Sequence, residues 1–166
     1  MISSFHTVIK TKLHPPVYRS QLVVRNRLIE RLMKDRNVKL TLVAAPAGFG
    51  KTTLLGQLFE KLVSSELCCW YSLDHADSDP AKFLLHFIAS LRTSLPNFGN
   101  NVLQLMEATI VSDITDTLAL IINDLADNTQ NIYLFIDDYH FSDSEQINQF
   151  IELLINLSPE NFHLII

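Results

Sequence analysis

The sequence contains only two cysteines in 166 residues, and these two, Cys68 and Cys69, are neighbours in an apolar run. This pattern excludes a scaffold held together by disulfide bonds. The sequence also has no apolar stretch near the ~20 residues that a membrane-spanning helix requires, and residues 1–16 lack the apolar core of a signal peptide. These absences predict a cytoplasmic protein without a membrane segment.

Positive charge is absent from residues 93–166, which contain eleven acidic residues and no lysine or arginine. Residues 1–39 show the opposite bias, with nine basic and two acidic residues, and the whole chain has a formal net charge of -5. The acidic portion disfavours direct binding of this chain to DNA. Any chemistry in it that requires a cation must obtain that cation from Mg²⁺ or from another part of a larger protein.

Short apolar runs alternate with amphipathic stretches, a pattern typical of βα units around a parallel sheet. Buried strands are expected at residues 38–44, 68–73 and 131–136, and another begins at Phe162. Helices are expected around residues 28–34, 54–62, 80–91, 102–106, 118–125 and 147–154. Asp79 before Pro80 is a typical helix start. Ser142, with Glu145 three residues later, predicts a capping box at the start of another helix.

The strongest chemical motif is a loop between the first expected strand and the helix after it, APAGFGKTT at residues 45–53. Glycines in such a loop allow successive backbone N–H groups to turn toward bound phosphates, and the helix N-terminus favours the same negative charge. Lys51 is expected to reach the β and γ phosphates, and Thr52 to place its hydroxyl on Mg²⁺. The usual motif begins with glycine where this sequence has Ala45, so the loop entrance is expected to differ in detail. The predicted phosphate-binding residues are Ala47, Gly48, Phe49, Gly50, Lys51, Thr52 and Thr53.

A second motif is the apolar run at residues 131–136, which ends in two adjacent carboxylates, Asp137 and Asp138. Adjacent residues of a strand face opposite ways, so the pair is not expected to act as one chelate. We assign Asp137 to Mg²⁺, together with Thr52, and Asp138 to catalysis, where it would polarise a water for attack on the γ phosphate. His140 either senses that phosphate or is an ordinary loop histidine bonded to backbone. Both motifs together predict a three-layer P-loop NTPase that binds ATP or ADP with Mg²⁺.

Four motifs occur in a characteristic order and spacing: VVRNRL at residues 23–28, PAGFGKTT at 46–53, WYSLD at 70–74 and IDDYH at 136–140. Together they resemble the ATPase domain of the MalT-type regulators. These are the large ATP-binding members of the LuxR family of bacterial transcription activators, in the STAND class of signal-transduction ATPases. The resemblance extends from about Lys12 to the last residue.

This resemblance implies an NTPase core of the AAA+ or STAND type at residues 38–166. Residues 1–37 would form an N-terminal extension and a short helix near the nucleotide base. Val24 and Arg25 would lie near the adenine and ribose, although Arg25 reads equally well as a solvated arginine at a helix start.

In that family the domain is a nucleotide switch, in which ADP favours a closed monomer and ATP with an inducer favours self-association. A sensor domain of helical repeats and a C-terminal helix-turn-helix domain that binds DNA follow it. A polar sensor, often Ser-Arg, normally follows the strand that begins here near Phe162. We therefore expect a truncated or excised part of such a regulator, with slow ATP hydrolysis at most. The inducer, self-association and DNA are expected partners of the longer protein.

Two other functions remain open from the sequence. A P-loop kinase or phosphotransferase usually needs an arginine-bearing lid over the donor phosphates, which the absence of Lys and Arg after Arg92 disfavours. An interaction module with a vestigial nucleotide site is disfavoured because Lys51, Thr52, Asp137 and Asp138 all occur together.

Overall fold

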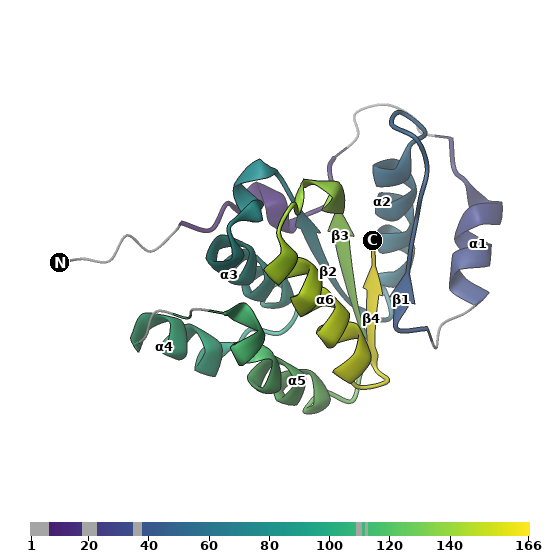
Figure 1. Ribbon diagram of the computed structural model, residues 1–166. Helices are drawn as coiled ribbons and strands as arrows, with labels where there is room; N and C mark the ends of the chain where they lie inside the picture. Colours follow the sequence, from purple (N-terminus) through teal and green to yellow (C-terminus); the bar gives the residue numbers. More distant parts are fainter. Residues whose placement is uncertain (1–6, 18–22, 35–37, 109–110, 112) are drawn as a thin grey trace.

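A four-stranded parallel sheet forms the centre of the protein (Figure 1). The computed structural model describes residues 7–17, 23–34, 38–108, 111 and 113–166. The strands are β1 (Leu40–Thr41), β2 (Leu67–Ser72), β3 (Ile132–Asp137) and β4 (Phe162–Ile165). Their order is β1-β4-β3-β2, and each neighbouring pair is parallel. The predicted α/β fold is confirmed, and β4 lies between β1, the strand before the phosphate loop, and β3, the strand that ends in Asp137.

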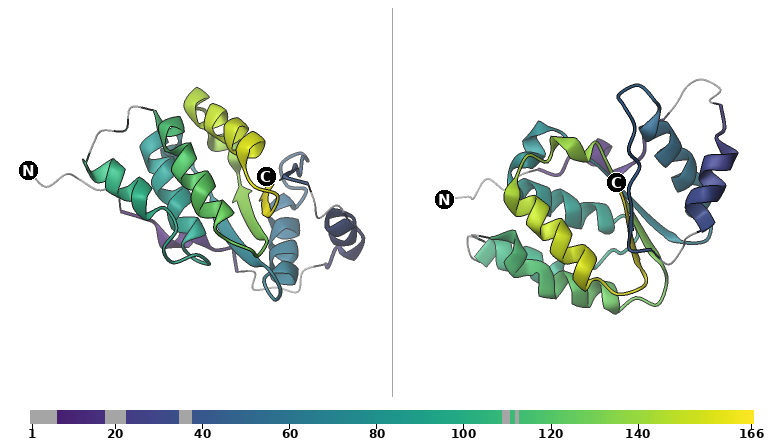
Figure 2. Two further views of the ribbon diagram at one scale, coloured as in Figure 1. Left: turned by 90° about the horizontal axis from the view of Figure 1, so that it is seen from below. Right: turned by 45° about the vertical axis from the view of Figure 1, so that its right-hand side comes forward.

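Helices cover both faces of the sheet and give the three layers of a P-loop NTPase-like fold (Figure 2). One face carries α1 (Asn26–Lys34) and α2 (Lys51–Leu62). The other carries α3 (Pro80–Leu91), α4 (Asn100–Ala108), α5 (Leu118–Ala126) and α6 (Glu145–Leu157). Short 3₁₀ helices are η1 (Lys10–Leu13), η2 (His75–Ser78), η3 (Ile114–Thr117) and η4 (Tyr139–Phe141). None of the helices in this described part of the chain combines the length and apolar character needed to cross a bilayer.

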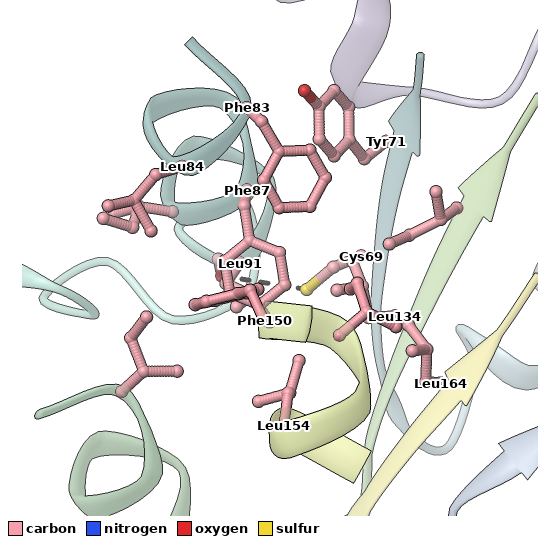
Figure 3. Close-up of a cluster of buried hydrophobic side chains, with 14 of the residues drawn as sticks. Cys69, Tyr71, Phe83, Leu84, Phe87, Leu91, Leu134, Phe150, Leu154 and Leu164 are labelled. Atoms are coloured by element: carbon pink, nitrogen blue, oxygen red, sulfur yellow. Dashed lines mark hydrogen bonds between the residues drawn. The ribbon is translucent and has the colours of Figure 1, made fainter. Parts of the chain in front are cut away.

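The two faces of the sheet have separate hydrophobic cores, because successive strand residues point to opposite sides. Cys69 and Leu134 face the larger core, where they meet aromatic and aliphatic side chains of α3 and α6 (Figure 3). Trp70 and Phe135 face α2, and their rings stack with centroids 5.8 Å apart. The adjacent cysteines therefore lie in different cores, and both are free thiols.

The segment before α1 is held against the opposite edge of the sheet from β1. Its helix η1 contacts β2 and α3. Lys12 Nζ lies 2.6 Å from Asp77 Oδ2 and 2.9 Å from Asp74 Oδ2. The backbone N–H of Ile9 donates to His86 Nε2 at 3.2 Å. Lys12 is only 8% exposed and Asp77 is fully buried, so this ion pair is part of the interior.

Two local predictions were wrong. Strand β1 covers Leu40–Thr41 rather than residues 38–44, although single backbone hydrogen bonds extend beyond it, from the Leu164 N–H to the Lys39 carbonyl at 2.8 Å and from the Val43 N–H to the Ile166 carbonyl at 2.6 Å. The capping box at Ser142 is also wrong. Ser142 Oγ is buried without a hydrogen-bond partner, and the cap of α6 is Ser144, whose Oγ accepts from the Ile147 N–H at 3.5 Å. The turn η4, closed by the Ser142 N–H on the Tyr139 carbonyl, delays the helix by two residues.

The other predicted helices are present. Asp79 caps α3 by accepting from the N–H groups of Ala81 and Lys82, with Pro80 as first residue, as predicted. Helix α4 is longer than the expected 102–106. The predicted extension at residues 1–37 falls partly outside the described residues, which begin at residue 7 and omit 18–22 and 35–37.

Candidate nucleotide-binding site

The loop at residues 45–53 forms a tight turn that only glycine accommodates easily at two positions. Gly48 has φ 83° and Gly50 has φ 74°, both in the left-handed region. Gly50 is the N-cap of α2, so the loop leads directly into the positive end of that helix. Asp138 is the one described non-glycine residue with positive φ, so Ala45 has an ordinary backbone angle and the missing first glycine imposes no strain.

Lys51 lies where two cavities meet. Its Nζ donates to the Ala45 carbonyl at 2.6 Å and to the Pro46 carbonyl at 3.3 Å. It lines a cavity of about 720 Å³ between the phosphate loop and α1. It also lines a second cavity, of about 280 Å³, beside the carboxyl end of β3. One ammonium group is therefore available to a ligand that extends from one cavity to the other.

Thr52 and Asp137 meet at the carboxyl end of the sheet, as the magnesium assignment requires. Thr52 Oγ1 donates to Asp137 Oδ1 at 3.1 Å, although the two residues are 85 positions apart. Asp137 is 5% exposed, and burial, reinforced by the charge of Asp138, raises the pKa of its carboxyl despite that hydrogen bond. A buried carboxylate beside a hydroxyl is an oxygen-donor pair that suits Mg²⁺, and a cation would offset the burial of the charge. The residues therefore fit the metal.

Asp138 is positioned differently from its neighbour. It is exposed, has φ 57°, and donates its N–H to Asp137 Oδ1 at 3.1 Å. Asp138 and His140 both line the 280 Å³ cavity, and His140 Nδ1 lies 3.8 Å from Asp138 Oδ1. Asp137 is thus buried and Asp138 is accessible to water, so the two carboxylates have different surroundings.

Of the two residues expected near the adenine, the structure brings Arg25 to the loop and leaves Val24 apart. Arg25 Nη1 donates to the Phe49 carbonyl at 2.8 Å, and Arg25 lines the 720 Å³ cavity. Val24 is 60% exposed and does not belong to the described lining of that cavity. Arg25 is therefore more than a solvated arginine at a helix start.

Sequence reasoning missed the far wall of the larger cavity. Leu28, Arg31 and Leu32 of α1 line it, together with Leu42 after β1. The signal was present in the apolar residues of α1 at positions 28, 29, 32 and 33, which indicate a buried helix face. The pattern, however, does not show whether this face packs on protein or on a ligand.

Comparison with known proteins places this sequence in a family. The sequence model of the family described as Nephrocystin 3, N-terminal, matches residues 20–166. The HTH-type transcriptional regulator MalT of Serratia proteamaculans is 35% identical over 159 residues, which cover 96% of this chain and 17% of that protein. MalT of Klebsiella pneumoniae is 30% identical over the same share of each chain. This chain thus spans about a sixth of the length of these relatives. The chain belongs to the family described as Nephrocystin 3, N-terminal, and its resemblance to the MalT-type regulators is confirmed over nearly its whole length.

Proposed function

We propose that this chain binds ATP or ADP with Mg²⁺ and acts as the nucleotide-switch domain of a larger transcription regulator. The observation that carries the proposal is the Thr52–Asp137 hydrogen bond of 3.1 Å, which joins the start of α2 to the end of β3. It brings a hydroxyl and a buried carboxylate together at the mouth of a glycine loop, which is the arrangement that Mg²⁺ bound to phosphates needs.

The two cavities suggest how the nucleotide lies. The larger one has apolar walls from α1, including Leu28 and Leu32, and would take the base. The loop would hold the phosphates with its backbone N–H groups, and Lys51 would neutralise part of their charge. The 280 Å³ cavity, with Asp138 and His140, would take the terminal phosphate and a water. Calorimetric titration with ATP and ADP in the presence of Mg²⁺ tests this, and absence of binding at millimolar nucleotide would overturn it.

The wider role of the protein follows from its relatives. They are named HTH-type transcriptional regulators, and this chain covers about a sixth of their length. We infer that the parent protein binds DNA through another domain, responds to an inducer, self-associates when it holds ATP, and works in the cytoplasm where its DNA lies. In such a regulator the bound nucleotide would control the conformation of the protein, which favours a nucleotide switch over a kinase.

ATP hydrolysis by this chain is expected to be slow, below about 0.1 s⁻¹, because the described lining of the 280 Å³ cavity has no arginine to stabilise the transition state. Lys51 is the one permanently charged cation in the described lining of the 280 Å³ cavity. An added arginine typically accelerates such reactions by about 10³–10⁵. Phosphate release under saturating ATP measures the rate. Turnover of several per second would contradict the switch and return the kinase or true ATPase to consideration.

Replacing Asp137 with asparagine is expected to separate function from stability. The variant keeps an oxygen for the Thr52 hydroxyl but removes a buried charge, so the free energy of unfolding without ligand should rise by about 1 kcal/mol. Affinity for ATP with Mg²⁺ should fall roughly tenfold or more, because a metal ligand is lost. Urea denaturation and calorimetry measure the two effects. The exposed Asp143→Asn is the matched control, and a variant that binds ATP with Mg²⁺ as tightly as wild type would refute the metal assignment.

A further inference from the structure

Gln57 of α2 holds the backbone that precedes α1 at two points. Its Oε1 accepts from the Arg25 N–H at 3.1 Å, and its Nε2 donates to the Val23 carbonyl at 3.0 Å. A carboxamide offers one acceptor and one donor side by side, so a single side chain satisfies both backbone groups. Gln57 itself does not belong to the described lining of the nucleotide cavity.

The backbone that Gln57 holds is the joint between α1, α2 and the phosphate loop. The Arg25 carbonyl accepts from the N–H groups of Leu28 and Ile29 at 3.0 and 3.1 Å, and so begins α1. The Arg25 guanidinium donates to the Phe49 carbonyl in the loop. It also lies directly over Gly50, where a Cβ atom would come within 2.8 Å of Arg25 Nη2. The backbone N–H, the carbonyl and the guanidinium of Arg25 thus contact α2, α1 and the phosphate loop, respectively.

We propose that Gln57 is a positioning residue for the base side of the nucleotide site. It acts through the Arg25 backbone and sets the distance between the α1 wall of the 720 Å³ cavity and the phosphate loop. This inference rests on the proposed function, because it assumes that the cavity takes a base. Gln57 lies outside the described lining of the cavity, so it would act without touching the ligand. Its effect is expected on the half of the site that binds the base.

The physical basis is the weak attachment of α1. Only nine residues long, it buries a single side chain fully, Ile29, and its first turn lacks acidic residues that would favour the helix dipole. A helix this short is marginal without tertiary contacts. Loss of the two hydrogen bonds from Gln57 should therefore loosen the α1 wall while the loop, set by Gly48 and Gly50, keeps its shape.

The test compares ligands that use different halves of the site. Gln57→Leu should weaken ADP binding about tenfold, the order expected for the loss of one to two hydrogen bonds. Binding of inorganic pyrophosphate, which we expect to occupy only the loop, should change by less than about twofold. Gln57→Glu keeps the acceptor for the Arg25 N–H but sets a carboxylate oxygen against the Val23 carbonyl, where two acceptors face each other, so ADP binding should weaken in this variant too. Exposed Gln149 of α6, replaced by leucine, is the matched control.

A second readout needs no nucleotide. Amide hydrogen exchange in α1 should become faster in Gln57→Leu, while exchange in α5 stays unchanged. Equal weakening of ADP and pyrophosphate, or unchanged exchange in α1, would overturn the positioning role. If wild type binds neither ligand, the proposed function fails and the base-side role fails with it. If wild type binds ADP and Gln57→Leu binds it equally well, only the role of Gln57 is lost.

Discussion

Replacement of Lys51 with alanine is expected to weaken the binding of ATP with Mg²⁺ about a hundredfold, the loss typical of a hydrogen bond between charged groups at a phosphate. The expected loss of affinity is large because the Lys51 ammonium lines both cavities. It is the one permanent cation in the described lining of the 280 Å³ cavity. Without it, the end of a triphosphate in the 280 Å³ cavity would face Asp137 and Asp138 with backbone N–H groups and Mg²⁺ to offset its charge, while Arg25 and Arg31 line the other cavity.

Calorimetry of wild type and Lys51→Ala with Mg²⁺ present measures the effect. Lys61→Ala is the matched control, because Lys61 is an exposed lysine in the same helix. The free energy of unfolding should change little in Lys51→Ala, since its two hydrogen bonds to loop carbonyls are exposed to solvent. Equal affinity in wild type and Lys51→Ala would remove the assignment of the phosphate site, whatever the fold.

The local parts of the site are those that the sequence predicts well. Gly48 and Gly50 are adjacent to the residues they serve, so a short motif describes the whole turn. Asp137 could be predicted to approach Thr52 because parallel strands place their carboxyl ends at one edge of the sheet. The turn follows from a short stretch of sequence, and the approach of Asp137 to Thr52 follows from the parallel direction of the strands.

The parts that sequence reasoning missed depend on side chains that meet across packed elements. Gln57 reads as an ordinary polar position of an amphipathic helix, and nothing in the pattern indicates that Val23 and Arg25 are its partners. The predicted strand at residues 38–44 is longer than β1, because a run of apolar residues does not specify where regular pairing begins and ends. Asp74 and Asp77 belong to an acidic stretch whose composition is typical of a solvated loop, although Asp77 is fully buried against a lysine 65 positions away.

That lysine has the largest expected effect on stability. Lys12→Met should lower the free energy of unfolding by about 3–5 kcal/mol, because it leaves the Asp77 carboxylate buried without its charged partner. Such a loss is a large fraction of the roughly 5–15 kcal/mol typical of a domain. Urea denaturation at neutral pH measures it. The control is Lys10→Met, at an exposed position of the same short helix, which should change stability by less than about 0.5 kcal/mol.

The pH dependence of the difference between wild type and Lys12→Met follows from the same contacts. Burial lowers the pKa of Lys12, but the hydrogen bonds to Asp77 and Asp74 and the negative charges of these two carboxylates together raise the pKa above 10.5. The contribution of the lysine is therefore present below that pH and lost as pH rises through the raised value. The hydrogen bond from Lys12 lowers the pKa of Asp74 below 3.8, so the contribution of this carboxylate is present above pH 3.8 and lost as pH falls through the lowered value. The difference should be largest between these limits.

A double-mutant cycle separates the ion pair from simple loss of packing. If the cost of Lys12→Met comes from the unpaired carboxylate, the same substitution in an Asp77→Asn background should cost less than about 1 kcal/mol. The carboxamide introduced by Asp77→Asn would keep an oxygen to accept the Asp74 N–H, which Asp77 Oδ2 now accepts at 2.8 Å. A cost that stays the same in both backgrounds would show that the lysine stem, rather than its charge, holds η1 against β2 and α3.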